Sequence, residues 1–150
     1  MRKAFIVLLA LIVASVVAFA YRMGRHDMQA LRDFETAYEH FDRAITALGA
    51  QRNPSSTEQA AAALADFQKK AAMRISSLTK NDGSMMMAAR EVAAMATQEL
   101  TAVNAYQAVA VTDADSARIL ATEAANVRNE RISRHARFQY LATAPPNSAY

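Results

Sequence analysis

The feature that most constrains this chain is an apolar run near its N-terminus. From Ala4 to Tyr21 the sequence AFIVLLALIVASVVAFAY contains no charged residue. As an α-helix this run would be about 27 Å long, which is close to the hydrocarbon thickness of a bilayer. The sequence therefore predicts a transmembrane signal-anchor over residues 1–22.

A cleaved signal peptide is the alternative interpretation of the same segment. Arg2 and Lys3 form a basic start, and Ala18-Phe19-Ala20 offers small residues at the two positions that signal peptidase recognises. Retention is favoured because the run exceeds the usual apolar length of about 7 to 15 residues and contains no glycine or proline. Basic residues favour the cytoplasmic side, so both interpretations place the remaining chain outside the cytoplasm. We expect a bacterial-type inner membrane protein whose domain faces the periplasm or exterior, with a secreted or periplasmic protein as the alternative.

The rest of the chain has the composition of one helical domain. Alanine is the most frequent residue, and the chain has only three glycines and three prolines. Two of the 17 Lys and Arg residues precede the apolar run, so 15 remain against 14 Asp and Glu. This nearly neutral balance argues against nucleic-acid binding. The absence of cysteine excludes disulfides and thiol chemistry.

Apolar residues after the run recur at helical spacing. The clearest series has steps of three and four, as in a heptad seam: Leu31, Phe34, Tyr38, Phe41, Ile45 and Leu48. Gly49 and Asn53-Pro54 end this helix, and Ser55 with Glu58 predicts a capping box for the next. The second helix is expected to bury Ala60, Leu64, Phe67, Ala71, Ile75 and Leu78 and to stop at 81–83.

Two further helices complete the predicted architecture. They are expected over about 84–111 and 113–141, separated by Thr112-Asp113-Ala114-Asp115. Short connections between four helices favour an up-down-up-down arrangement. The predicted fold is therefore all-α, with a single N-terminal transmembrane helix followed by a four-helix bundle over 23–143 and an irregular tail over 144–150.

Residues with metal-binding chemistry do not form a recognised motif. Met85-Met86-Met87 lie on one predicted helix, where successive side chains point about 100° apart and cannot converge on one ion. If the first and last helices are antiparallel, His26 and His135 would lie at comparable height, which makes a haem or metal pair conceivable. A surface or rim histidine is the commoner outcome, so we expect no metal and no cofactor.

Glu99 is the most informative polar residue. It falls within the apolar stripe of the third helix, where a carboxylate needs a partner. Arg131 falls within the stripe of the fourth helix formed by Leu120, Ala124, Val127 and Phe138, and Arg128 lies toward its edge. The expected partners of Glu99 are Arg128 or Arg131, followed by Tyr38. A structural ion pair is the favoured interpretation, and a polar ligand pocket is the alternative.

The apolar run also suggests a place for a partner. Ala10, Ala14 and Ala18 share one face of the predicted span, where small residues let another helix approach closely. With no catalytic motif visible, we expect a non-enzymatic accessory or protein-interaction subunit of a membrane assembly. Its expected partners are the membrane and either a membrane protein or a second copy. The alternative is an extracytoplasmic ligand-binding or sensor-like bundle, secreted if the signal peptide is cleaved.

Overall fold

The computed structural model describes residues 2–50, 53–78 and 83–143, and it describes side chains there except those of residues 2–12 and 19. All regular structure in these ranges is helical. The four helices are α1 (Arg2–Ala50), α2 (Pro54–Ser76), α3 (Ser84–Val109) and α4 (Ala114–Thr143). The all-α prediction is therefore confirmed.

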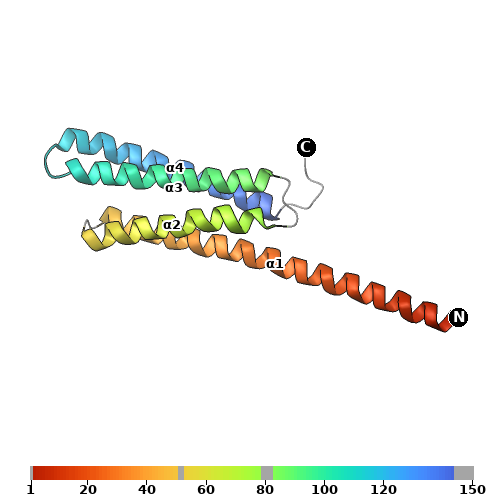
Figure 1. Ribbon diagram of the computed structural model, residues 1–150. Helices are drawn as coiled ribbons and strands as arrows, with labels where there is room; N and C mark the ends of the chain where they lie inside the picture. The colour runs from red at the N-terminus through yellow and green to blue at the C-terminus, as the bar shows by residue number, and fades with distance from the viewer. Residues whose placement is uncertain (1, 51–52, 79–82, 144–150) are drawn as a thin grey trace.

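The helices form a bundle in which successive helices run in opposite directions (Figure 1). At one end of the bundle α1 ends near the start of α2 and α3 ends near the start of α4, and at the other end α2 ends near the start of α3. The N-terminal part of α1 extends well beyond the bundle at this second end. α1 thus crosses the expected boundary at residue 22 as one uninterrupted helix.

For about half of the predicted membrane span, the structure does not describe the side chains. Residues 4–12 and 19 fall in that category, and Val13, Val16 and Val17 are exposed on α1. No helix meets the length and apolarity that a membrane crossing requires when the described residues are searched.

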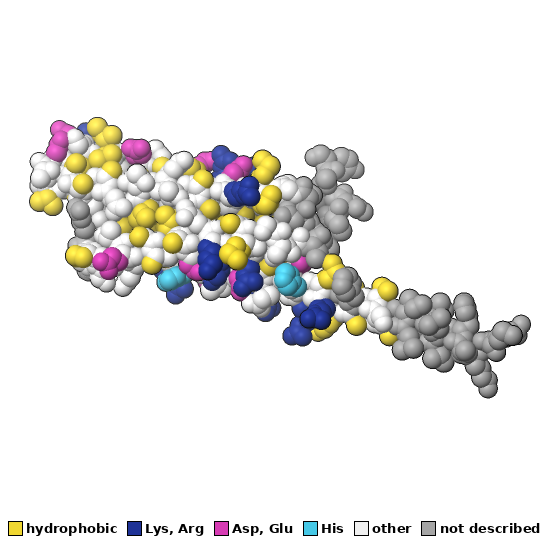
Figure 2. Space-filling model, in the orientation of Figure 1, with side chains coloured by type: hydrophobic (Ala, Val, Ile, Leu, Met, Phe, Trp, Pro, Cys, Tyr) yellow, Lys and Arg dark blue, Asp and Glu magenta, His cyan; other side chains and the backbone are white. Residues whose placement is uncertain are grey.

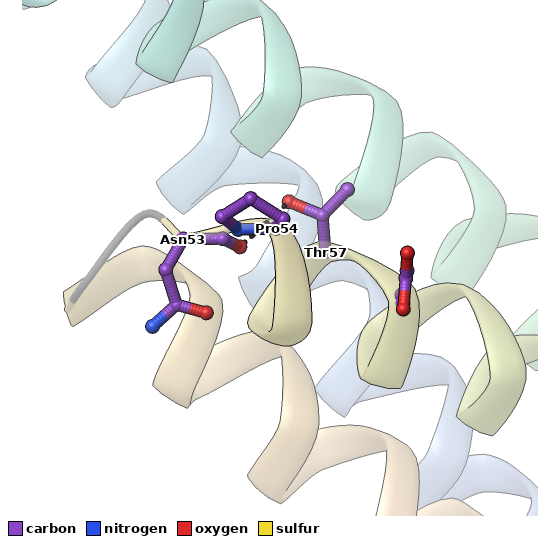
Figure 3. A pocket seen from close by; sticks show the side chains of 4 residues that line it. Asn53, Pro54 and Thr57 are labelled. Carbon is purple, nitrogen blue, oxygen red and sulfur yellow. Dashed lines mark hydrogen bonds between the residues drawn. The ribbon is translucent and has the colours of Figure 1, made fainter.

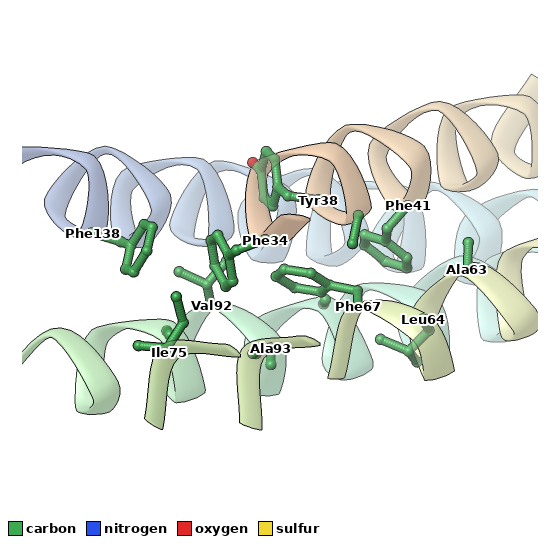
Figure 4. Packing of buried hydrophobic residues seen from close by; sticks show 14 of the residues in the cluster. Phe34, Tyr38, Phe41, Ala63, Leu64, Phe67, Ile75, Val92, Ala93 and Phe138 are labelled. Atoms are coloured by element: carbon green, nitrogen blue, oxygen red, sulfur yellow. The ribbon is translucent and has the colours of Figure 1, made fainter. Parts of the chain in front are cut away.

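The core lies mainly between α1, α2 and α3. Both predicted stripes are buried as expected: from α1 only Leu31 is partly exposed, and all six residues expected of the second helix are buried. α2 ends at Ser76, however, so Leu78 reaches the core from beyond the helix. Aromatic rings fill the centre (Figure 4), with the Phe34 centroid 5.1 Å from that of Phe67 and 4.2 Å from that of Phe138. Burying a phenylalanine side chain contributes about 1.5–3 kcal/mol relative to leaving it exposed.

α4 joins the bundle in a different way from the other helices. Its buried residues are Ala117, Arg131, His135 and Phe138, whereas Leu120, Ala124 and Val127 of the predicted stripe are only partly buried. α4 packs closely on α3, which faces the core with small residues such as Ala89 and Ala96. Toward α1 it reaches through long side chains rather than by close backbone approach.

The start of α2 differs from the predicted capping box. Asn53 is the N-cap: its side chain accepts a hydrogen bond from the Ser56 N–H at 2.7 Å, and Ser56 Oγ accepts from the Asn53 N–H at 3.1 Å. The prediction of Ser55 and Glu58 was wrong because Pro54 takes the first helical position, where its missing N–H costs nothing. Figure 3 shows Asn53, Pro54 and Thr57 at this turn.

The other helix ends also differ slightly from the sequence-based limits. α3 ends at Val109 rather than near residue 111, and Asp113 caps α4 by accepting the Asp115 and Ser116 N–H groups, both at 3.1 Å. Hydrogen bonds from Ser116 lower the pKa of Asp113. α3 is preceded by Gly83 with a φ of 89°, a left-handed conformation that side chains with a Cβ rarely adopt.

Candidate functional site

A buried charged cluster joins three helices at the middle of the bundle. Glu99 of α3 is 2% exposed, and Arg131 of α4 is 0% exposed. Arg131 Nε donates a hydrogen bond to Glu99 Oε2, and its Nη2 donates to Asp42 Oδ1 of α1 at 2.5 Å. One guanidinium thereby links α4 to both α3 and α1.

Aromatic rings enclose the Arg131 guanidinium. Its Cζ lies 5.0 Å from the ring centroid of Tyr38 and 5.4 Å from that of Phe41, both within cation–π range. Burial acts to lower the pKa of Arg131, but hydrogen bonds to Glu99 and Asp42 outweigh burial and raise it. The guanidinium is therefore held in its charged form.

Tyr38 is buried beside this cluster and contacts a second polar pair. Its ring stacks on His135 with centroids 3.6 Å apart, and His135 Nε2 lies 2.9 Å from Glu35 Oε2. Burial raises the pKa of Tyr38, with contributions from the carboxylates of Asp42, Glu99 and Glu35, while Arg131 acts against the rise. The phenol therefore remains neutral at physiological pH.

Arg128 is at the edge of the cluster rather than inside it. Its side chain is 40% exposed, its guanidinium lies 3.7 Å from Asp42 and 4.0 Å from Glu99, and it donates to Thr46 Oγ1 at 2.9 Å. Sequence reasoning placed Arg128 toward the edge of the stripe and counted it among the buried polar candidates, and its side chain lies at that edge, only partly buried. It precedes Arg131 by three residues, so its Cα is rotated about 60° toward solvent.

His26 and His135 do not form a pair. His26 is exposed on α1 with its Nδ1 3.9 Å from Asp27, whereas His135 packs on Tyr38. Twelve residues of α1 separate His26 from that level, roughly 18 Å. No three His, Cys, Asp or Glu side chains within the described ranges are grouped as a metal site would require.

The predicted packing face of α1 is only partly described. Ala14 and Ala18 have exposed side chains, and the side chain of Ala10 lies outside the described residues. The methionines behave as helix geometry requires, because Met85 and Met86 pack against the core whereas Met87 is exposed. These residues therefore do not converge on one point.

Asp42 of the cluster and Glu35, the partner of His135, were missed by sequence reasoning. Both lie beside the core stripe of α1 on the side that faces α4. Helical spacing could have placed them together on one flank of the stripe. Sequence alone could not show which neighbouring helix covers that flank.

An open groove lies next to the cluster, between α1 and the end of α4. Its volume is about 790 Å³, and its lining includes apolar Met28, Leu31 and Phe138 and charged Arg32 and Glu35. A second hollow, of about 450 Å³ at the turn before α2, is lined by the capping residues in Figure 3. The groove is therefore the better candidate for binding.

The charged cluster has the features of a structural element. Glu99 and Asp42 balance Arg131 and Arg128, and the carboxylates bind the guanidinium groups directly. A buried ion pair of this kind fixes which helix faces meet, because breaking it leaves an uncompensated charge. No protein-family model, curated protein or solved structure matches this chain.

Proposed function

We propose that this chain is a membrane-anchored protein whose helical bundle lies outside the cytoplasm and acts as an accessory or protein-interaction subunit. The observation that carries this proposal is the continuity of α1. One helix begins in the apolar N-terminal sequence and continues to Ala50, where its second half supplies much of the bundle core. A bundle attached in this way is held rigidly next to the membrane.

The arrangement of polar groups supports a non-enzymatic role. The most buried charged side chains, Glu99 and Arg131, are occupied by each other and by Asp42. Catalytic acids and bases need a substrate-accessible position, whereas these groups hold helices together. The surfaces left for binding are the groove between α1 and α4 and the projecting part of α1.

Extraction of whole membranes at alkaline pH tests the anchor. We expect the full chain to stay in the membrane pellet, because an apolar helix of about 27 Å fits the bilayer core. N-terminal sequencing of the same protein should show that the apolar run is retained. A mature protein that begins at Tyr21 and is released into the soluble fraction would overturn the anchor.

A second candidate function is ligand binding by an extracytoplasmic bundle that is secreted after cleavage. The groove between α1 and α4 favours it, since a concave surface lined by apolar residues together with a few charged ones is typical of small-molecule sites. An apolar fluorescent dye should then bind the full chain and bind less well after Ala142→Trp, which fills the groove. Ser133→Trp on the exposed face of α4 is the matched control. Equal dye binding by both variants would dismiss this candidate.

A further inference from the structure

The part of α1 that projects from the bundle carries a second apolar stripe. This outer stripe follows spacings of three and four and consists of Ala14, Val17, Tyr21, Gly24, Met28 and Leu31. The core stripe begins with Leu31 and Phe34, so two steps of three follow each other at Leu31. A heptad would have a step of four after Leu31, so the spacing is one residue short there, and the apolar stripe is rotated by about 100° around the helix. The outer stripe therefore faces to one side of the bundle core, and Leu31, where the two stripes meet, still packs against that core.

The larger side chains of the outer stripe are exposed. Val17 is 62%, Tyr21 67% and Met28 55% exposed. Figure 2 shows hydrophobic and basic side chains next to each other where α1 leaves the bundle. Val13 and Val16, outside the stripe, are also exposed, so exposure singles out this face only from Tyr21 onward, where the exposed large apolar side chains of α1 are Tyr21 and Met28. Exposed apolar residues that share one helix face indicate an interaction surface.

Gly24 has no role inside the described part of the chain. A glycine in the middle of a helix costs about 1 kcal/mol relative to alanine. A Cβ added at Gly24 would meet nothing within 4 Å, so no packing within this chain requires the glycine. Its missing side chain leaves a shallow hollow of about 530 Å³ between Tyr21, Arg25, Met28 and Arg32. Such a hollow allows the backbone of another helix to approach closely.

We propose that α1 pairs in parallel with α1 of a second copy of this chain through the outer stripe. In this pairing Tyr21 and Met28 occupy a positions, and Gly24 and Leu31 occupy d positions. The orientation and the partner follow from the flanking charges, since e and g residues of paired helices face each other.

The flanking residues are Arg25 and Arg32 at e and Asp27 at g. A parallel pair places Arg32 opposite Asp27 of the second copy and Arg25 opposite the uncharged Ala20. An antiparallel pair would place Arg25 and Arg32 opposite each other. The Asp27 side chain is 17% exposed and its carboxylate lies 3.9 Å from His26 Nδ1, so a donor from the second copy would share a carboxylate that already has a neighbour in its own chain. Charge therefore selects the parallel arrangement, which two copies in one membrane would also adopt.

The groove between α1 and α4 continues the same surface. Met28 lines both the hollow at Gly24 and the groove, whose lining includes Leu31 and Phe138. A helix that follows the outer stripe toward the bundle thus has room beside the last turns of α4. The inference deepens the proposed function, on which it rests, by naming the partner as a second copy.

Cysteine crosslinking in membranes tests the pairing, because the chain has no cysteine of its own. Tyr21→Cys and Met28→Cys place a thiol in the outer stripe, and His26→Cys places one at the f position on the opposite face. With copper(II) phenanthroline as oxidant, we expect disulfide-linked dimer at Tyr21→Cys and Met28→Cys to exceed that at His26→Cys by about fivefold or more. Equal yields at the three positions, or no dimer at any, would overturn the proposal.

Two substitutions in the Met28→Cys background sharpen the test. Gly24→Leu should reduce the dimer severalfold without lowering the melting temperature, since a Cβ at position 24 meets nothing within 4 Å and leucine favours the helix more than glycine does. Arg32→Glu should also reduce it, because Glu would face Asp27, whereas Arg43→Glu on the same helix should not. A crosslinked product of another mass would show a different partner and overturn self-pairing.

The membranes used for crosslinking also separate this inference from the anchor. Part of each sample is extracted at alkaline pH. A chain that stays in the pellet without forming dimer overturns only the pairing. A chain that is released but still forms dimer overturns only the anchor.

Discussion

The interfaces of α1 with α2 and with α4 are built from opposite chemistry. Against α2, α1 presents Phe34, Phe41 and Ile45, and the contact is apolar and tightly packed. Against α4, Phe34 contacts Phe138, but the rest of the interface consists of Glu35, Tyr38 and Asp42, which meet the polar side chains of Arg131 and His135. The apolar interface supplies stability through burial. The polar interface specifies which faces meet and adds stability only while all of its partners are present.

Phe67→Asp should have the largest effect, because it acts at the centre of the apolar interface. The Phe67 ring contacts Phe34, Tyr38 and Phe41, and an aspartate there would be buried among them. Loss of the ring and burial of an unpaired charge should together cost about 5 kcal/mol or more. Circular dichroism during urea unfolding should show no cooperative transition. Ala65→Asp, on the exposed face of α2, should stay within about 0.5 kcal/mol of wild type. A normal transition for Phe67→Asp would refute the packing described here.

Arg131→Met breaks the polar interface and should cost about 3–5 kcal/mol, because the buried Glu99 loses the cation that donates a hydrogen bond to it and keeps only Arg128 at 4.0 Å. Combining it with Glu99→Leu should recover most of this loss, since an apolar pair can replace a buried ion pair. Urea unfolding of the two variants measures the difference. Arg118→Met removes an exposed arginine and is the control. If the single and double variants are equally destabilised, the cluster does not act through charge compensation.

Asn53→Ala tests the turn that sets the register of the apolar interface. The substitution removes the acceptor for the Ser56 N–H and should cost about 1 kcal/mol. Thermal unfolding should show a lowered melting temperature. Ser55→Ala, one residue past the proline, should have little effect, although the sequence had suggested it as the cap. A larger effect of Ser55→Ala than of Asn53→Ala would contradict the assigned cap.

Tyr38 should give the polar interface a small dependence on alkaline pH. Because burial raises its pKa, the folded chain keeps the phenol protonated where the unfolded chain, with a pKa of about 10, ionises. This contribution is complete below about pH 10 and is lost as the pH rises toward the folded-state pKa. Wild type should therefore lose more stability than Tyr38→Phe between about pH 9 and pH 11. Tyr140→Phe, at an exposed position, should follow wild type. Parallel curves for wild type and Tyr38→Phe would contradict the burial of this phenol.

The same contrast explains what could be predicted from sequence. Periodic apolar residues such as Phe41 and Phe67 mark their buried faces directly, so the stripes of α1 and α2 were predictable. Glu99 and Arg131 could be found because they interrupt such stripes. Asp42 and Glu35 lie on the flank of a stripe, where most charges face solvent, and only the position of α4 shows that they are covered. The cap at Asn53 was missed because Ser55 and Glu58 match the commoner motif.

The side-chain hydrogen bond between His135 and Glu35 joins residues that are 100 positions apart in the sequence. Closing a loop of this size is entropically costly, whereas α1 and α2 meet across a turn of only a few residues. The α1–α2 hairpin should therefore form early in folding, and α4 should dock on α1 last. Until α4 has been synthesised, the flank of α1 that carries Tyr38 and Asp42 remains open to water. Because this flank is polar, its exposure during synthesis does not promote aggregation, whereas an apolar flank exposed for the same time would.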